Sequence, residues 1–268
     1  MGVPRVALFL AAAIGLAVAL AGAALAGVAR AAEEVELKEH DWAHAGVFSS
    51  FDPAQLRRGF QVYTEVCAVC HSMQYLAFRN LMEIGFSEDE VKELAADYVV
   101  IDGPDNEGEM FERDARPSDY FPSPFPNENA ARYANNGAFP LDLSLIIKAR
   151  EDGLDYVYSL LTGFEEEPPE GFELPEDFEL ADGMYFNRYF PGHQIAMPQP
   201  LYDDFVEYED GTVASIDQMS EDVTVFLDWI AEPKSDERKK IGLRVLIFLA
   251  VFSALMYAVK VHVWSKLH

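Results

Sequence analysis

The stretch DPAQLRRGFQVYTEVCAVCH, residues 52–71, decides what this chain folds into. Asp52 can cap a helix, Pro53 suits the first helical position, and Gln55 completes a start like a capping box. The apolar residues that follow recur at helical spacing and predict a core-facing stripe: Leu56, Phe60, Tyr63 and Val66. This predicted helix runs directly into Cys67.

The motif Cys67-Ala68-Val69-Cys70-His71 contains both cysteines of the chain. Cys-x-x-Cys-His is the attachment signature of haem c, in which each thiol forms a thioether with a haem vinyl group and the histidine binds the iron. A thioredoxin-like redox pair would follow a strand, whereas a helix precedes Cys67, and a zinc site would need more ligands. We therefore predict one covalently attached haem c, bound by Cys67, Cys70 and His71.

The sixth iron ligand has several candidates. His–Met ligation raises the haem potential and suits electron transfer, because a filled sixth position blocks oxygen binding. Met197 lies in the loop QIAMPQP, residues 194–200, which two prolines stiffen. His193 is the chief alternative, and Met73 is too close to His71 to reach the opposite haem face. The remaining candidates are Met82, Met110, Met184, Met219, His40 and His44; local reasoning favours Met197.

An apolar segment, residues 6–25, lies near the start of the chain. It follows Arg5 and leads to Ala29-Arg30-Ala31, an order typical of a secretory signal. An uncleaved anchor is the alternative. We expect cleavage, so that residues 1–31 are a signal peptide.

A second apolar segment, residues 241–264, lies near the end. With Arg244 and Lys260 extending outward, it offers about 24 residues, enough to cross about 30 Å of hydrocarbon. We predict one transmembrane helix there. The rest of the mature chain divides into a haem domain at 32–233, a linker at 234–240 and a tail at 265–268.

The charges beside the predicted span give a mixed signal for its orientation. Lysines and an arginine at 234–240 precede the span, so the positive-inside rule alone would place the large domain in the cytoplasm. Long domains translocate largely regardless of charge, and haem attachment to this motif occurs outside the bacterial cytoplasmic membrane. We therefore expect a bacterial inner-membrane protein whose haem domain lies in the periplasm. An organellar origin is less favoured because the leader is not rich in Arg and Ser.

The net charge is −26, and the acidic excess lies in residues 32–231. Such a domain repels nucleic acid, which excludes nucleic-acid binding as its function, and it attracts cationic partners. The alternative is that the acidic residues on the surface serve only to keep the domain soluble.

Helical signals dominate the chain. Ser220 is expected to cap a second helix, which ends at Pro233. The segments 87–114 and 165–182 are expected to be solvated acidic loops, and strand signals are weak. The fold class is mainly α.

The segment Trp42–Leu81 strongly resembles cytochrome c1, the haem subunit of the cytochrome bc1 complex. The resemblance continues, in the same order, through residues 134–138, 155–163, 185–192 and the tail from Trp229. It implies a class I cytochrome c-like domain with long irregular insertions. It also implies Met197 as the sixth ligand, Arg150 near a haem propionate, and a haem pocket lined by Tyr156, Asn135 and Pro140.

The chain departs from the family pattern at two points. Phe139-Pro140-Leu141 keeps only one proline of a frequent pair, and the extra cysteine pair of some bacterial relatives is absent. The pocket wall at Leu141 therefore departs from the family pattern, and the loop of Met197 is expected to be held by packing and prolines.

The resemblance implies an electron relay with no catalytic chemistry of its own. The haem would accept single electrons from a Rieske iron–sulfur protein and pass them to a soluble or tethered c-type cytochrome, within a complex that contains cytochrome b. Two other classes remain open. A peroxidase-like enzyme would need an open sixth site and a distal residue such as His193, and an anchored shuttle would work outside any complex.

Overall fold

The computed structural model describes residues 35–169, 171–172, 174 and 178–266; the predicted signal peptide lies outside them. Helices dominate these residues, which confirms the predicted mainly α class. The elements are α2 (Pro53–Glu65), the 3-10 helices η1 (Cys67–Val69) and η2 (Phe78–Ile84), α3 (Glu88–Ala96), β1 (Val99–Asp102), β2 (Phe111–Asp114), α4 (Glu128–Ala134), α5 (Gly153–Leu161), β3 (Tyr185–Phe186), β4 (Gln194–Ile195), α6 (Ile216–Ala231) and α7 (Ser235–Trp264).

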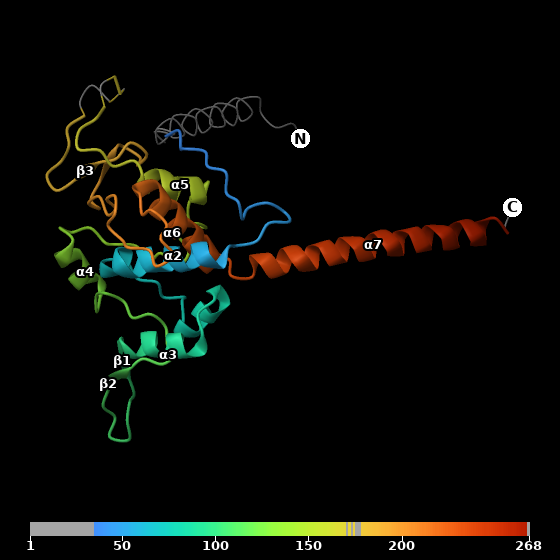
Figure 1. Cartoon of the computed structure of the whole chain (residues 1–268), viewed down its shortest axis with the longest axis horizontal. Coiled ribbons are helices and arrows are strands. Elements are labelled where there is room, and N and C mark those ends of the chain that lie inside the picture. Colours follow the sequence, from blue (N-terminus) through green and yellow to red (C-terminus); the bar gives the residue numbers. More distant parts are fainter. Residues whose placement is uncertain (1–34, 170, 173, 175–177, 267–268) are drawn as a thin grey trace, which may run out of the picture. The chain divides into compact units, whose positions relative to one another are not determined.

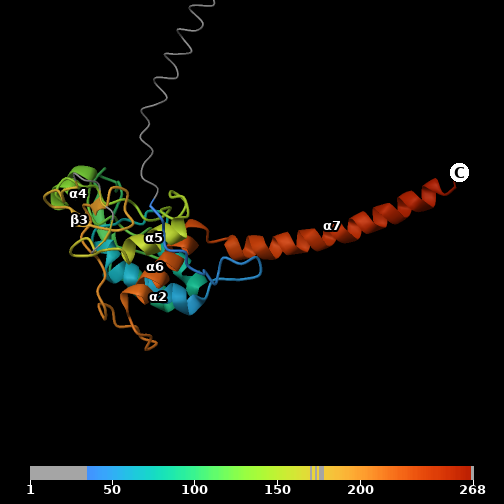
Figure 2. The same cartoon turned by 90° about the horizontal axis from the view of Figure 1, so that it is seen from above.

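Helices α2 and α6 pack together at the centre of the core (Figures 1 and 2). Their contact is close because Gly59 has no side chain: a Cβ there would lie 2.1 Å from the carbonyl oxygen of Asp222. Phe60 of α2 meets Phe226 of α6 edge to face, with ring centroids 5.7 Å apart. The apolar stripe predicted from the sequence is therefore the face of α2 that covers α6.

The start of α2 matches the prediction in its cap and differs in one contact. The side chain of Asp52 accepts a hydrogen bond from the backbone N–H of Ala54 at 3.2 Å, which confirms it as the N-cap. Gln55 does not complete a capping box. Its amide Nε2 instead donates to Glu221 Oε1 on α6 at 3.0 Å, so this side chain joins the two helices.

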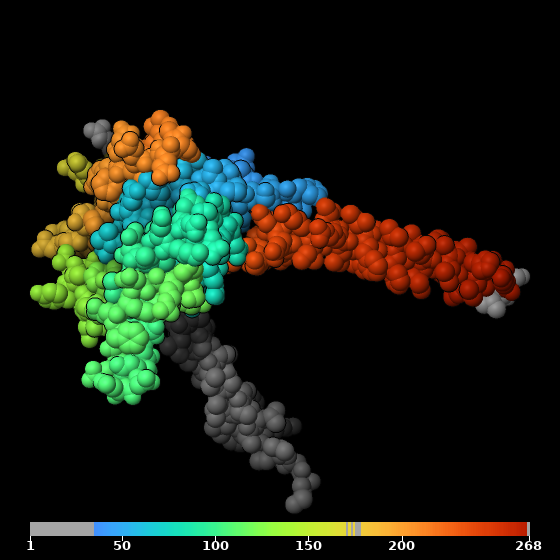
Figure 3. All heavy atoms as spheres, turned by 60° about the horizontal axis from the view of Figure 1, so that its bottom comes forward, coloured from blue at the N-terminus to red at the C-terminus, as the bar shows by residue number. Residues whose placement is uncertain are grey.

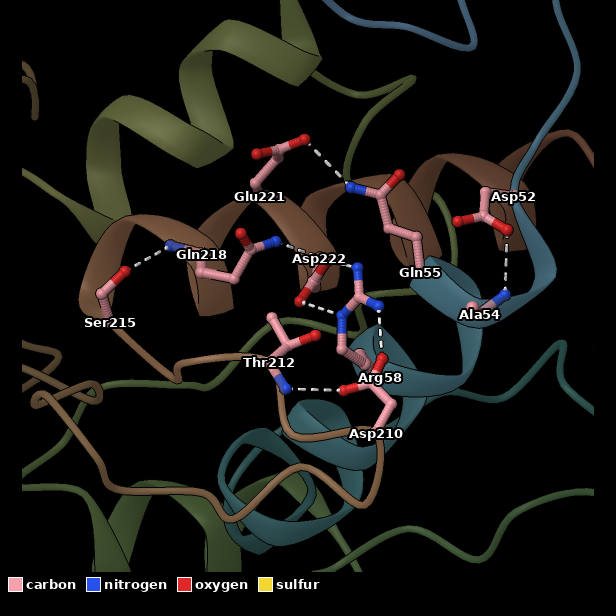
Figure 4. Close-up of polar contacts among 10 residues, drawn as sticks. All are labelled: Asp52, Ala54, Gln55, Arg58, Asp210, Thr212, Ser215, Gln218, Glu221 and Asp222. Atoms are coloured by element: carbon pink, nitrogen blue, oxygen red, sulfur yellow. Dashed lines mark hydrogen bonds and ion pairs between the residues drawn. The ribbon is translucent and has the colours of Figure 1, made fainter.

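A buried ion pair also joins α2 to α6 (Figure 4). Arg58 donates to both carboxylate oxygens of Asp222, at 2.9 and 3.1 Å, and also to Asp210 at 2.8 Å. Gln218 adds a hydrogen bond to Asp222 at 3.1 Å. Burial alone would lower the pKa of Arg58, but its hydrogen bonds to Asp222 and the charge of that carboxylate raise the pKa above its ordinary value.

Helix α6 begins five residues earlier than predicted. Its N-cap is Ser215, whose hydroxyl accepts from the backbone N–H of Gln218 at 3.2 Å. Ser220, the predicted cap, is fully buried inside the helix. The difference follows from tertiary packing, because the preceding Met219 is also fully buried and extends the apolar face of the helix by a turn.

The segment 87–114 is not the acidic loop that was expected. Ser87 and Glu90 form a reciprocal capping box that starts α3. Strands β1 and β2 then pair as an antiparallel hairpin, with Ile101 opposite Glu112; Figure 3 shows this part of the chain, in green, standing out from the surface. Most acids of this segment therefore lie on regular elements, and Asp105, Glu107 and Glu109 lie in the loop that joins the two strands.

Helix α7 is the membrane candidate. Among the described residues it alone is long and apolar enough to cross a membrane, with 30 residues and a mean hydropathy of 2.1 over its most apolar window. The helix begins at Ser235, so residues 235–240, expected as a linker, form its first turns. The apolar part of α7 is therefore preceded by helix rather than by a flexible linker.

Candidate haem site

The motif Cys67–His71 lies on a tight turn that continues from α2. The backbone N–H groups of Cys70 and His71 both donate to the carbonyl of Cys67, at 3.1 and 2.8 Å. This turn holds the three side chains on one short segment. Both cysteines are free and half-buried.

The environment of Cys67 argues against a redox-active pair of cysteines. Burial, reinforced by the neighbouring Cys70, raises the pKa of the Cys67 thiol to about 12. Reactive redox cysteines have a lowered thiol pKa, because the thiolate is the nucleophile. The environment of Cys67 therefore differs from that of a redox-active cysteine.

His71 is oriented by a hydrogen bond from across the site. Its Nδ1 lies 2.7 Å from the carbonyl oxygen of Leu141, so Nδ1–H donates and Nε2 keeps its lone pair for a metal. Burial lowers the pKa of the imidazole and favours its neutral form, the form that binds iron. The hydroxyl of Tyr63 donates to the carbonyl of His71 at 3.3 Å and ties the motif back to α2.

Asp142 holds the segment after His71 and was missed by the sequence analysis. One carboxylate oxygen accepts from the hydroxyl of Ser72 at 2.7 Å and from the backbone N–H of Gln74 at 2.9 Å. The other accepts from the backbone N–H of Ser144 at 3.0 Å. A single acid within the apolar run FPLDLSL, residues 139–145, was the available signal. Asp142 thus fixes the segment that contains Leu141, whose carbonyl accepts the hydrogen bond from His71.

The residues implied to line the pocket fall into separate groups. Pro140 is half-buried and directly precedes Leu141, so it lies beside the motif. Arg150 is exposed, and its guanidinium lies 5.6 Å from the ring centroid of Tyr156. Asn135 ends α4, where its side-chain amide donates to the carbonyl of Ala131 at 2.7 Å. The structure thus pairs Arg150 with Tyr156, and the haem contacts of these residues stay predictions.

Met197 lies two residues beyond β4 and is half-buried. The short ladder of β3 and β4, in which Tyr185 faces Ile195, fixes the start of its loop. The rival His193 is buried, and its Nδ1 lies 3.0 Å from the carbonyl of Arg188 on its own loop. Its ring also packs against Phe172, with centroids 5.0 Å apart.

The other ligand candidates have separate surroundings. Met73 and Met219 are fully buried in the core, whereas Met82 and Met110 are exposed. His40 packs on Trp42, with centroids 4.6 Å apart. His44 Nε2 lies 3.0 Å from Asp228, and Met184 is half-buried just before β3. Met197 as the sixth ligand stays a prediction. Met184 is a suitable control residue for a substitution of Met197.

The surface around the motif fits a large apolar group. Val69, inside the motif, is 66% exposed, and Phe139 and Leu141 on the facing segment are also exposed. A haem attached to Cys67 and Cys70 would cover side chains of this kind. The two thiols, the oriented imidazole and the apolar surroundings together fit haem c.

The chain is similar to known proteins over most of its length. The model of the cytochrome C1 family matches residues 42–267. "Cytochrome c1" of Rhodospirillum rubrum is 48% identical over 261 residues, which cover 94% of each chain. "Cytochrome b/c1" of Bradyrhizobium diazoefficiens is 47% identical over 96% of this chain and 40% of that longer protein. The "Cytochrome b-c1 complex catalytic subunit, mitochondrial" of Candida albicans is 49% identical over 85% of this chain and 77% of its own. The extent of these matches shows that the chain belongs to the cytochrome c1 family.

Proposed function

We propose that this chain is the electron-transfer subunit of a respiratory or photosynthetic cytochrome bc1 complex. It would relay single electrons from the Rieske iron–sulfur protein to a c-type cytochrome. The observation that carries the proposal is the fixed imidazole of His71 beside Cys67 and Cys70, in a chain of the cytochrome c1 family.

The residues of the site would divide the work. Cys67 and Cys70 would hold the haem covalently, and His71 and Met197 would be the ligands of its iron. When bound, the haem supplies a one-electron redox change at its iron. The chain's own contribution would be to keep the imidazole of His71 neutral and oriented through Leu141, and to keep oxygen from the iron with the thioether of Met197.

We infer the partners and the location from the same assignment to a cytochrome bc1 complex. The names of the Bradyrhizobium and Candida relatives support cytochrome b and a bc1 complex as the setting. Helix α7 would be a single span of the bacterial inner membrane, with the haem domain in the periplasm after removal of residues 1–31. The acidic surface would attract a cationic c-type cytochrome, soluble or tethered.

Rapid mixing of the purified complex tests the proposal. The haem of this subunit is reduced, then mixed with an oxidised cationic c-type cytochrome at increasing ionic strength. We expect electron transfer with a second-order rate that falls steeply with salt. Absence of transfer would overturn the relay, and a rate independent of salt would remove the electrostatic docking while leaving the relay in place.

A further inference from the structure

The loop 45–50, between Trp42 and α2, carries the two most exposed apolar residues at this end of the chain. Val47 is 76% exposed and Phe48 is 85% exposed. The residues that flank the loop are buried, since Trp42 and Phe51 each keep only 9% of their surface exposed. The loop is therefore an apolar tip on a stem that is anchored in the core.

The stem of this loop is fixed by several contacts. His44 stacks on Phe51, with centroids 4.7 Å apart, and its Nε2 lies 3.0 Å from Asp228 of α6. Two turns close the loop, through the hydrogen bonds from Ala45 N–H to Trp42 O at 2.9 Å and from Ser49 N–H to Gly46 O at 3.2 Å. A loop held in this way presents its tip in a defined place.

The same loop is joined to the start of α7. The ammonium of Lys239 donates to the carbonyls of His44 and Ser49, at 2.7 and 3.2 Å, and so holds both ends of the loop. The backbone N–H of Phe51 donates to Asp236 at 3.3 Å. In Figures 1, 2 and 3 the blue loop lies beside the first, orange-red turns of α7.

These contacts place both ends of the loop beside the start of the apolar part of α7. Lys239 precedes Ile241, where the exposed apolar surface of α7 begins, by two residues, or about 3 Å along a helix axis. A spanning helix enters the hydrocarbon at the interfacial layer of the bilayer. Transfer of a small apolar tip from water into this layer is favourable in free energy. Lys240 and Arg244, both exposed near this level, suit lipid phosphate groups.

We propose that the loop 45–50 inserts Val47 and Phe48 into the interfacial layer of the lipid bilayer beside α7. It would be a second, non-spanning membrane contact that fixes the height and tilt of the domain above the membrane. The proposal rests on the membrane-spanning placement of α7 proposed above. It commits to lipid as the occupant because the tip is tied to the helix at its point of entry.

Spin-label accessibility in the assembled complex tests this proposal. Phe48→Cys is labelled with a nitroxide in the complex reconstituted into nanodiscs of phosphatidylcholine and phosphatidylglycerol. Collisions with oxygen, which dissolves in lipid, are compared with collisions with a water-soluble nickel chelate. Val213→Cys, at a residue 72% exposed on another loop, is the matched control. Ser253→Cys, within the apolar run of α7, reports on the span itself.

We expect the label at position 48 to collide with oxygen at least about threefold more often, relative to nickel, than the label at position 213. Equal ratios at the two positions would overturn the proposal, and so would a label at 48 shielded from both reagents, which would indicate a protein contact. A water-accessible label at 253 would instead contradict the membrane span, so the two failures are distinguishable.

Discussion

Replacing Arg58 with leucine should destabilise the domain strongly. The side chain of Asp222 is fully buried and that of Arg58 is 16% exposed, so Arg58→Leu leaves a buried carboxylate without its two hydrogen bonds from the guanidinium. Breaking a buried pair from one side costs about 3–5 kcal/mol, because the remaining charge is uncompensated. For a domain of this size that corresponds to a fall in Tm of roughly 6–20 °C.

The neighbouring Arg57 supplies the control. Its ion pair with Glu90, at 3.0 Å, lies at the surface, so Arg57→Leu should cost about 1 kcal/mol or less. Circular dichroism of the purified holoprotein during heating measures both variants. The double variant Arg58→Leu/Asp222→Leu should recover much of the loss, since apolar pairs often replace buried ion pairs without cost. Equal losses for Arg57→Leu and Arg58→Leu would refute the reasoning.

Three further outcomes are expected. Gly59→Ala should cost about 1–3 kcal/mol in urea unfolding because its Cβ would overlap the backbone of α6, whereas Gly242→Ala, which meets no atom within 4 Å, should not. Asp142→Ala should speed amide exchange at Gln74 by about tenfold or more, measured by mass spectrometry, because a hydrogen bond to a charged group is lost. Hydrogen bonds from the backbone and side chain of Thr212, followed by one from the guanidinium of Arg58, lower the pKa of Asp210 to about 2 from an ordinary value of 3.8. This lowered pKa contributes stability that is fully present above about pH 4 and is lost as the pH falls towards 2. Asp210→Asn should therefore weaken the dependence of the urea midpoint on pH between pH 4.5 and 2.5. An unchanged dependence on pH would contradict this.

The elements that the sequence predicted well are those whose signals are local. The start of α2 needs only Asp52, Pro53 and an apolar stripe that faces one side. The capping box of Ser87 and Glu90 was equally local, but the surrounding acids led to the prediction of a loop. The start of α6 was misplaced for a different reason, because the burial of Met219 depends on partners distant in the sequence.

The candidate site divides in the same way. Cys67, Cys70 and His71 could be identified because the chemistry of haem attachment requires one short spacing. The carbonyl partner of His71 and the carboxylate of Asp142 lie about 70 residues away in the chain. No periodicity links such positions, so only the folded structure could reveal that they orient the ligand.

The measurement that tests the central claim most directly is the binding of carbon monoxide to the reduced protein. Spectra of the wild type, Met197→Leu and the control Met184→Leu are recorded with and without the gas. A Met-ligated electron relay predicts that the wild type and Met184→Leu ignore carbon monoxide, while Met197→Leu binds it and loses its high potential. Ready binding by the wild type, or no change in Met197→Leu, would contradict the account and turn attention to His193.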